Sequence, residues 1–331
     1  MNRSPSLELT RCVVCDSANA REIAGADDIR DEREALWDFH TKRLKGETPP
    51  EHLVDRVAFS QAPPFRVVQC EECGLVYRNP RERASELERA YAGEAPDRAV
   101  LQALHDAQRT AYRAQAERLT DVMGRTGSGV EVGSYVGAFL AAAGDAGWRV
   151  EGVDVNEPAN DFARSLGFHV TTADIEAFRV GASGRRVDAV AIWNCFDQLP
   201  DPRQAARAAH ALLVHGGVLA VRVPNGGFYA AVRPGLDGVA ASIARALLAH
   251  NNLLGFPYRL GFTPASLARL LEDAGFRVVR TEGDALVPVA DEWTHGWAAL
   301  EERVVKAALK TAARMTGADG AAWFEVYARR A

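Results

Sequence analysis

The chain of 331 residues has no apolar run that approaches the roughly 18 to 20 residues of a membrane-spanning helix. Its first residues, MNRSPSLELTRC, lack the apolar stretch of a secretion signal. These absences argue against the membrane and secreted classes, and we expect a cytoplasmic protein with no membrane partner. The hydrophobic content of 47% is enough for a packed core, and the length is typical of about two domains.

An excess of positive charge is also lacking. The net charge is −5, and residues 1–80 hold 11 Arg plus Lys against 14 Asp plus Glu. Proteins that bind nucleic acid usually concentrate Lys and Arg on one face. The charge therefore argues against a nucleic acid as the partner, whereas the oligomeric state stays open.

Cysteine is scarce, with five residues, yet four of them form the C-x-x-C pairs Cys12 with Cys15 and Cys70 with Cys73. Two such pairs have the spacing of a tetrahedral zinc site, whose four thiolates leave no open position for catalysis. Disulfides are less favoured without a secretion signal. A redox pair is less favoured still, because neither pair opens an obvious helix. We predict that residues 1–80 form a zinc-binding domain with these four metal ligands.

The stretch GVEVGSYVGAFLAAA, residues 129–143, predicts a buried strand that turns through glycines into a helix. Gly133 and Gly137 permit a tight turn and the close approach of a ligand. A second strand, at 148–155, contains Asp154, which lies 21 residues past Gly133. Nucleotide-binding α/β units place a carboxylate there to accept hydrogen bonds from ribose hydroxyls. An ordinary turn without a ligand is the alternative.

Strands and helices alternate through residues 119–331, which predicts a doubly wound, mostly parallel sheet. A helical linker, residues 81–118, is expected to pack on this domain. Ligands of such sheets bind beyond the carboxyl ends of the strands. The candidate segments at those ends are Gly133 to Gly137, Asp154 to Asn156, Asp174 with Ile175, and Asn194 to Gln198. Cys195, the unpaired cysteine, is expected to be a buried thiol rather than a nucleophile.

The glycine turn resembles motif I of class I S-adenosylmethionine-dependent methyltransferases, E-x-G-x-G-x-G. Glu131, Gly133 and Gly137 match it, and Tyr135 stands at the middle glycine. WNCFDQLPDP likewise resembles the W-D-V-L-E-H-L-P-D-P run of these enzymes, and the likeness extends over nearly the whole chain. Paired cysteine knuckles ahead of such a domain resemble the bacterial branch that includes sugar C-methyltransferases. Two departures are Gln198, where many relatives have histidine, and the missing long C-terminal domain of the sugar C-methyltransferases.

The resemblance implies a seven-stranded Rossmann-like sheet and S-adenosylmethionine as a cofactor, in addition to the zinc. It assigns backbone groups of Gly133 and Asn194 to the methionine ammonium and Asp154 to the ribose. Asp174 and Ile175 would contact the adenine. The full set of expected cofactor-binding residues is Glu131, Gly133, Ser134, Tyr135, Gly137, Asp154, Val155, Asn156, Asp174, Ile175, Asn194, Cys195 and Phe196.

Two inserts, residues 226–261 and 290–318, follow the expected fifth and sixth strands. They would lie over the carboxyl-end crevice, where they could roof the acceptor site or instead form extra core or a dimer face. Gln198 has no acid-base chemistry near neutral pH, so any general base is expected from the inserts. The expected catalytic residues are His250 and Tyr258, with His295 as a further candidate.

Three functions stay open. The favoured one is methyl transfer to a small-molecule acceptor, such as a sugar nucleotide or a secondary metabolite. The second is an RNA or protein methyltransferase that holds its substrate with the zinc module. The third is a non-enzymatic S-adenosylmethionine-binding scaffold, suggested by Tyr135 and Gln198. Acidic charge favours the small molecule over RNA, and the presence of Asp154 and Asp174 favours cofactor binding, so we predict an enzyme.

Overall fold

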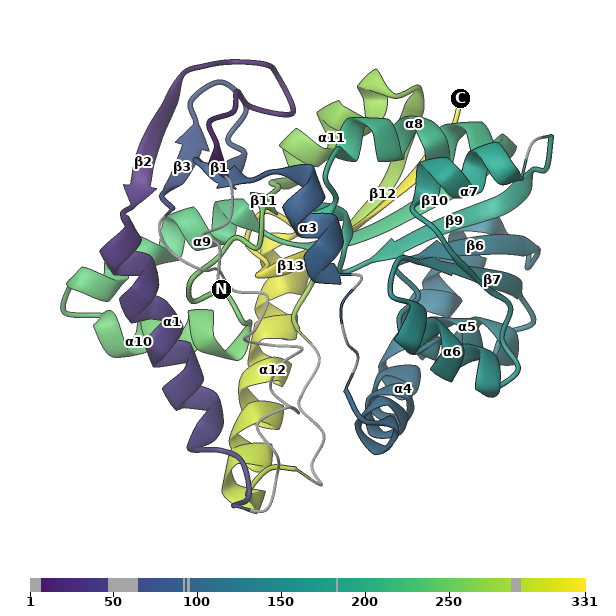
Figure 1. Ribbon diagram of the computed structural model, residues 1–331. Helices are drawn as coiled ribbons and strands as arrows, with labels where there is room; N and C mark the ends of the chain where they lie inside the picture. Colours follow the sequence, from purple (N-terminus) through teal and green to yellow (C-terminus); the bar gives the residue numbers. More distant parts are fainter. Residues whose placement is uncertain (1–6, 47–64, 92, 94–95, 183, 287–292) are drawn as a thin grey trace.

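The computed structural model describes residues 7–46, 65–91, 93, 96–182, 184–286 and 293–331. Its centre is a seven-stranded sheet in the order β12, β13, β10, β9, β6, β7, β8 (Figure 1). Strands β10, β9, β6, β7 and β8 pair in parallel, and β13 is antiparallel to both of its neighbours. The predicted doubly wound, mostly parallel sheet is therefore confirmed. The strands are Ser128–Val132 (β6), Arg149–Asp154 (β7), Val170–Thr172 (β8), Val187–Trp193 (β9), Leu213–Pro224 (β10), Phe276–Asp284 (β12) and Trp323–Arg330 (β13).

Helices cover both faces of the sheet (Figure 1). Helices α4, α5 and α6 lie on one face, and α7, α8 and α11 lie on the other. Helix α4 spans most of the predicted linker and packs on α5 and β10. The helices of these two layers are Arg98–Met123 (α4), Ala138–Asp145 (α5), Glu157–Ser165 (α6), Ile175–Gly181 (α7), Pro202–Leu212 (α8) and Pro264–Asp273 (α11).

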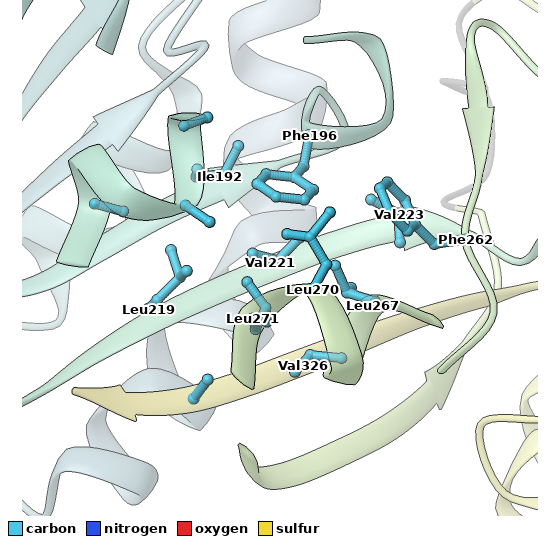
Figure 2. Close-up of a cluster of buried hydrophobic side chains, with 14 of the residues drawn as sticks. Ile192, Phe196, Leu219, Val221, Val223, Phe262, Leu267, Leu270, Leu271 and Val326 are labelled. Carbon is cyan, nitrogen blue, oxygen red and sulfur yellow. The ribbon is translucent and has the colours of Figure 1, made fainter. Parts of the chain in front are cut away.

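The main hydrophobic core lies between the sheet and the α8 and α11 layer (Figure 2). Val221 and Val326 of the sheet face Leu267, Leu270 and Leu271 of α11 there. Strand β9, VDAVAIW, has six of its seven residues buried, which is the pattern of a central parallel strand covered on both faces. The core therefore fixes the strand ends that carry the candidate site.

The N-terminal part forms a second sheet, in the order β11, β4, β3, β2. Its first three strands in the chain are Ala20–Ala24 (β2), Val67–Cys70 (β3) and Val76–Arg78 (β4), whereas β11, Leu260–Gly261, comes from the first insert. Pairing of β11 with β4 is antiparallel. The short strands Leu7–Glu8 (β1) and Arg81–Glu82 (β5) pair beside this sheet. The insert thus joins the N-terminal sheet, and the division at residues 80 and 118 stays a prediction.

A second core joins the N-terminal part to the first insert and to the last strand of the sheet. Leu36 of α1, Leu248 of α10 and Trp323 of β13 belong to one buried cluster. Helix α10 belongs to the first insert. No described helix is long and apolar enough to cross a membrane. The elements of this region are Ala26–Thr41 (α1), Ala84–Tyr91 (α3), Phe196–Gln198 (η2), Gly226–Val232 (α9), Arg233–Asp237 (η3), Ala241–His250 (α10) and Gly296–Thr316 (α12).

Candidate functional site

A left-handed glycine turn follows β6 at the carboxyl edge of the sheet. The backbone φ angle is +76° at Gly133, +42° at Tyr135 and +71° at Gly137. A Cβ atom at Gly133 would lie 2.5 Å from Sγ of Cys195, so no side chain fits there. The turn therefore lies where the sequence predicts it, with glycine required at position 133 by both conformation and packing.

The carboxylate of Asp154, at the end of β7, is joined to this turn. Its Oδ2 accepts the N–H of Tyr135 and its Oδ1 accepts the N–H of Asn156, each at 2.9 Å. Burial raises the pKa of Asp154, and the backbone N–H groups of Asn156, Tyr135 and Val155 oppose the increase. Tyr135 replaces the middle glycine of the family pattern, yet its N–H still serves this carboxylate. Asp154 therefore links two adjacent strand ends.

Three other polar side chains near the turn are buried. Glu131 is 2% exposed, Ser134 is 3% exposed and Asp197 is fully buried. Among the described residues, Oε2 of Glu131, Oγ of Ser134 and both carboxylate oxygens of Asp197 have no hydrogen-bond partner. Buried polar atoms rarely stay unpaired in proteins, because desolvation without a partner costs free energy. These atoms therefore indicate where a polar ligand would bind.

Acidic groups surround the thiol of Cys195. Burial raises its pKa well above the ordinary value, and the charges of Asp154, Asp197 and Glu131 raise it further. Burial also raises the pKa of Glu131 and of Asp197 well above their ordinary ranges, and the charge of Asp154 adds to the shift of Glu131. A cationic ligand would favour the ionised form of each acid. The ammonium and sulfonium of S-adenosylmethionine fit that requirement.

Residues 194–196 follow β9 and approach the glycine turn from the side. Asn194 has a left-handed φ of +59°, and its N–H donates to the carbonyl of Arg222 at 2.9 Å. Sγ of Cys195 donates to the carbonyl of Val132 at 3.3 Å, which holds the two strand ends together. The Phe196 side chain points into the main core (Figure 2), so only its backbone is available to a cofactor.

Two helix caps complete the predicted cofactor-binding residues. Asn156 caps α6 by accepting the N–H of Ala159, and it follows the half-buried Val155. Asp174 is exposed and caps α7 by accepting the N–H of Ala177, while Ile175 is buried. Both caps lie directly after strands that neighbour β6 or β7, so the chain brings the predicted cofactor-binding residues to one edge of the sheet.

Tyr91, at the end of α3, is a site residue that sequence reasoning missed. Its hydroxyl donates to Oε1 of Gln198 at 2.7 Å, and Nε2 of Gln198 donates to the carbonyl of Asn194 at 2.8 Å. Burial raises the pKa of Tyr91, and the charge of Asp197 adds to the shift. Nδ2 of Asn156 also donates to the carbonyl of Tyr91 at 3.0 Å. The linker thus reaches across the candidate site, 107 residues from Gln198 in the sequence.

Tyr258, in the first insert, lies near Tyr91. The charges of Asp197 and of Tyr258 both contribute to raising the pKa of Tyr91, after burial. The half-buried Tyr258 accepts a hydrogen bond from Nδ2 of Asn252 at 2.6 Å. Oδ1 of Asn252 in turn lies 3.4 Å from Nε2 of His40. The first insert therefore brings a phenol near Tyr91 and the candidate site.

His250 lies in a different environment. Its Nε2 is 3.5 Å from Oε1 of Glu301 in α12, and its ring packs edge-on against Phe39 of α1 with 4.9 Å between centroids. Burial lowers its pKa to about 4, with the positive charge of Lys306 as the next cause. The His250 ring contacts α1 and α12, whereas Tyr258 is hydrogen-bonded to Asn252. His295 is exposed and precedes α12.

The four paired cysteines converge in the N-terminal part. Their sulfur atoms all lie within 4.8 Å of one another, with 3.4 Å between Cys12 and Cys73 and 3.5 Å between Cys15 and Cys70. These separations are too long for disulfides, in which sulfur atoms are about 2.05 Å apart. Zn–S bonds of about 2.3 Å in a tetrahedron place sulfur atoms about 3.8 Å apart, so the donor set fits zinc.

Comparisons with known proteins were made for the whole chain. Residues 103–281, more than half of the chain, match the family model described as "Methyltransferase domain". No curated protein matches the chain significantly. The similar solved structures include an S-adenosylmethionine-dependent methyltransferase from Archaeoglobus fulgidus, with 17% identity and a TM-score of 0.44 over 67% of this chain and 94% of that chain.

Two further similar structures are also methyltransferases by name. One, from Thermotoga maritima, is described as a possible histamine N-methyltransferase and has 18% identity and a TM-score of 0.42 over 69% of this chain and 91% of that chain. The other is a plantazolicin methyltransferase in complex with SAH, with 13% identity and a TM-score of 0.45 over 74% of this chain and 93% of that chain.

The family match spans α4 to β12 and includes the glycine turn, Asp154 and the segment after β9. The sheet has the seven strands that the resemblance implies, and the buried acids at its edge suit a cationic cofactor. The chain therefore belongs to the methyltransferase-domain family, and it is an S-adenosylmethionine-dependent enzyme.

Proposed function

We propose that this enzyme binds S-adenosylmethionine across the carboxyl ends of β6, β7 and β9 and methylates a small-molecule acceptor. The observation that carries the proposal is the set of buried acids without partners, Glu131 and Asp197, beside a left-handed glycine turn. An ammonium or sulfonium group would supply the missing counter-charge. Asp154 would serve the ribose, and Asp174 with Ile175 would serve the adenine.

When bound, S-adenosylmethionine supplies a methyl group on a sulfonium, which a nucleophile of the acceptor displaces. The protein's own task is to align the acceptor, exclude water and take up a proton where the nucleophile carries one. Tyr258 is the better-placed group for that proton, because its oxygen accepts a hydrogen bond from Nδ2 of Asn252 beside the candidate site. The buried His250, whose pKa is lowered to about 4, would be neutral and would instead stabilise the packing of α10 on α12.

A small-molecule acceptor, such as a sugar nucleotide or a secondary metabolite, agrees with the net charge of −5. The proposal also includes one structural zinc ion on Cys12, Cys15, Cys70 and Cys73. Its support is the closed set of four sulfur atoms, which leaves no position for a substrate. Each knuckle has a left-handed residue just after its second cysteine, Asp16 with φ of +60° and Gly74 with φ of +74°.

Cofactor binding can be tested by calorimetry with the Asp154→Asn variant. An amide would accept only one of the two N–H hydrogen bonds and would weaken the ribose contact. We expect a loss of about 1 to 3 kcal/mol, or about ten- to a hundred-fold in S-adenosylmethionine affinity. Asp145→Asn is the matched control, because Asp145 forms a surface ion pair with Arg109. Equal affinities in both variants would contradict the cofactor assignment.

Transfer of labelled methyl groups to metabolite extracts tests the second half of the proposal. Wild-type protein should label a small molecule, and Tyr258→Phe should lower that turnover about a hundred-fold while leaving cofactor affinity nearly unchanged. Label found only in RNA or protein would overturn the acceptor class. Normal turnover in the Tyr258→Phe variant would remove Tyr258 from the mechanism.

A further inference from the structure

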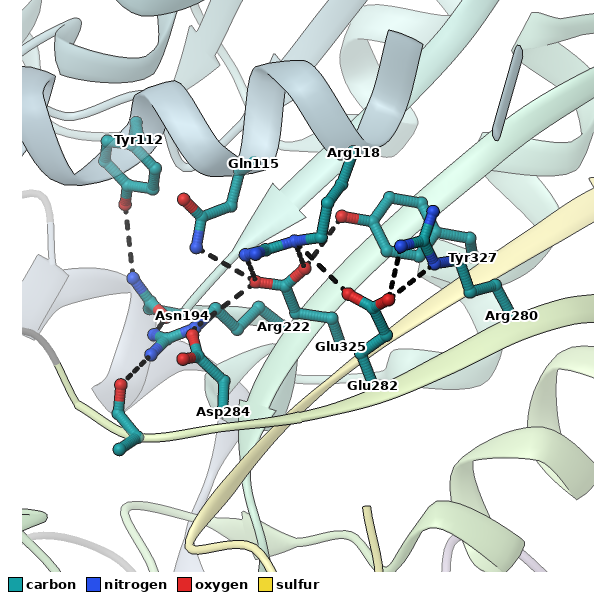
Figure 3. A network of polar contacts seen from close by, with 11 residues as sticks. Tyr112, Gln115, Arg118, Asn194, Arg222, Arg280, Glu282, Asp284, Glu325 and Tyr327 are labelled. Carbon is teal, nitrogen blue, oxygen red and sulfur yellow. Dashed lines mark hydrogen bonds and ion pairs between the residues drawn. The ribbon is translucent and has the colours of Figure 1, made fainter. Parts of the chain in front are cut away.

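A buried ionic network lies on the α4 side of the sheet, next to the carboxyl edge that carries the candidate site (Figure 3). Arg222 of β10 is 2% exposed, and its Nε donates to Oδ2 of Asp284 at 3.0 Å. Its Nη2 donates to the carbonyl of Ala285 at 3.0 Å, and its guanidinium carbon lies 4.6 Å from the centroid of the Trp323 ring. Its Nη1 donates to Oδ1 of Asn194. The guanidinium is therefore fixed on several sides.

The carboxylates of Asp284 and Glu325 balance the positive charge of Arg222, so the neutral amide of Asn194 is not needed for that purpose. Burial favours the neutral form of Asp284, but the positive charge of Arg222, the N–H of Ala285 and the charges of Lys310 and Arg118 together outweigh it, so the pKa of Asp284 lies below its ordinary value. Glu325 lies 3.8 Å from Nε of Arg222 and also accepts two hydrogen bonds from Arg118 of α4. Two buried carboxylates thus face two guanidinium groups. The hydrogen bond to the neutral amide of Asn194 is additional, and its consequence is to orient that amide.

Both ends of the Asn194 side chain are held. Its Oδ1 accepts from Arg222, and its Nδ2 donates to the hydroxyl of Tyr112 in α4 at 3.1 Å (Figure 3). An amide can make this pair of contacts because one end accepts and the other donates. The backbone of Asn194 is left-handed, a conformation that disfavours most side chains. Its carbonyl accepts from Gln198, and the next residue, Cys195, packs under the glycine turn.

We propose that Arg222 is a positioning residue for cofactor binding. Its guanidinium holds the Asn194 side chain, and this anchor keeps the left-handed backbone of Asn194 in place beside the glycine turn. The inference rests on the proposed function and on the assignment, implied by the family resemblance, of the Asn194 backbone to the methionine ammonium. It goes beyond that function because Arg222 would act on the cofactor through Asn194.

The test measures S-adenosylmethionine affinity by calorimetry and folding by thermal unfolding in matched variants. Arg222→Lys keeps the charge but lacks the planar group that serves Asp284, Ala285 and Asn194 together. We expect a loss of affinity of about three- to thirty-fold. Tyr112→Phe loosens the other end of the amide without disturbing a charge and should weaken binding about three- to ten-fold. Arg280→Gln is the control, since Arg280 pairs with Glu282 in the same network.

The Asn194→Gly background separates positioning from general stability. Glycine adopts a positive φ without strain and has no side chain for Arg222 to hold. In that background Arg222→Lys should change affinity less than about twofold, whereas it should still lower the unfolding temperature, because the contacts of Arg222 with Asp284 and Ala285 do not depend on Asn194. Equal affinity losses in both backgrounds would overturn the inference. So would wild-type affinity in both Arg222→Lys and Tyr112→Phe. A wild-type protein that binds no S-adenosylmethionine would overturn the proposed function, and this inference with it.

Discussion

Replacing Gly133 by alanine tests how tightly the glycine turn packs against Cys195 in the candidate site. The variant meets two separate penalties, a backbone φ of +76° and a Cβ atom 2.5 Å from Sγ of Cys195. Gly124, which ends α4, has nearly the same φ of +74°, but a Cβ atom there would have nothing within 4 Å. The Gly133→Ala and Gly124→Ala variants therefore share the conformational penalty and differ in the contact with Cys195.

The two penalties can be given separate magnitudes. A left-handed alanine costs about 1 to 2 kcal/mol, which is the expected loss of unfolding free energy in Gly124→Ala. At Gly133 the extra carbon enters a filled space, which adds about 1 to 3 kcal/mol to the loss of unfolding free energy. That contact is relieved only by moving the turn or Cys195, and Cys195 is the neighbour of Asn194. We therefore expect Gly133→Ala to weaken S-adenosylmethionine binding by about ten- to a hundred-fold as well.

Urea denaturation and calorimetry measure the two effects, and Cys195→Ala supplies a rescue. Removal of the sulfur leaves only Cβ of residue 195, which would lie 3.3 Å from the new carbon. The Gly133→Ala, Cys195→Ala double variant should therefore recover most of the contact penalty and retain the conformational one. The reasoning fails if Gly133→Ala behaves like Gly124→Ala in both assays, or if the double variant binds cofactor no better than Gly133→Ala alone.

Two further predictions concern the N-terminal part and the insert. Removing zinc with a chelator should lower the unfolding temperature in a single transition, because Cys12 and Cys70 belong to the same core as Phe196; two separate calorimetric transitions would contradict the shared core. The pKa of His250 is lowered to about 4 by burial and the charge of Lys306, so the unfolded chain binds more protons below pH 6.5. The free energy of unfolding should therefore fall by on the order of 2 kcal/mol between pH 7.5 and 5. Urea denaturation of His250→Gln should show this decrease reduced, and a variant with the same pH dependence as the wild type would refute the prediction.

Local signals in the sequence predict most of the methyltransferase part. Helical periodicity predicts a helix from about Asp97 to Met123, and the structure has Arg98–Met123. The agreement has a physical cause, since Gly124 takes the left-handed conformation that ends a helix. Alternating strands and helices predict the mostly parallel sheet, because each strand and each helix carries its own apolar pattern.

The β-branched residues of HVTTADI predict a strand over residues 169–175, but the strand in the structure is shorter. It ends at Thr172, because the Asp174 side chain accepts the N–H of Ala177 and starts α7. Aspartate is a preferred helix cap, so the signal was present in the sequence. The boundary matters for the site, since it puts Asp174 at a helix start instead of inside a strand.

Contacts between distant residues could not be predicted in this way. Arg222 and Asp284 are separated by 62 residues, and Arg118 and Glu325 by 207. A charged residue in a strand usually indicates a solvent-facing position, and nothing local shows that an opposite charge will cover it. The two-residue strand β11 has no periodicity of its own, so its pairing with β4 depends on the folded chain.

Residues 194–196, which follow β9, are held by contacts with α4 and with the main core, and the helix that follows them contacts the first cysteine knuckle. Arg222 and Tyr112 hold Asn194 from the α4 side, and Phe196 is anchored in the core on the opposite face. Arg203, at the start of α8, donates to the carbonyl of Val14 in the first cysteine knuckle at 2.7 Å. The knuckle therefore borders the helix that directly follows the cofactor segment. A metal bound there would stabilise the wall of the cofactor site as well as the N-terminal sheet, although it offers no position to a substrate.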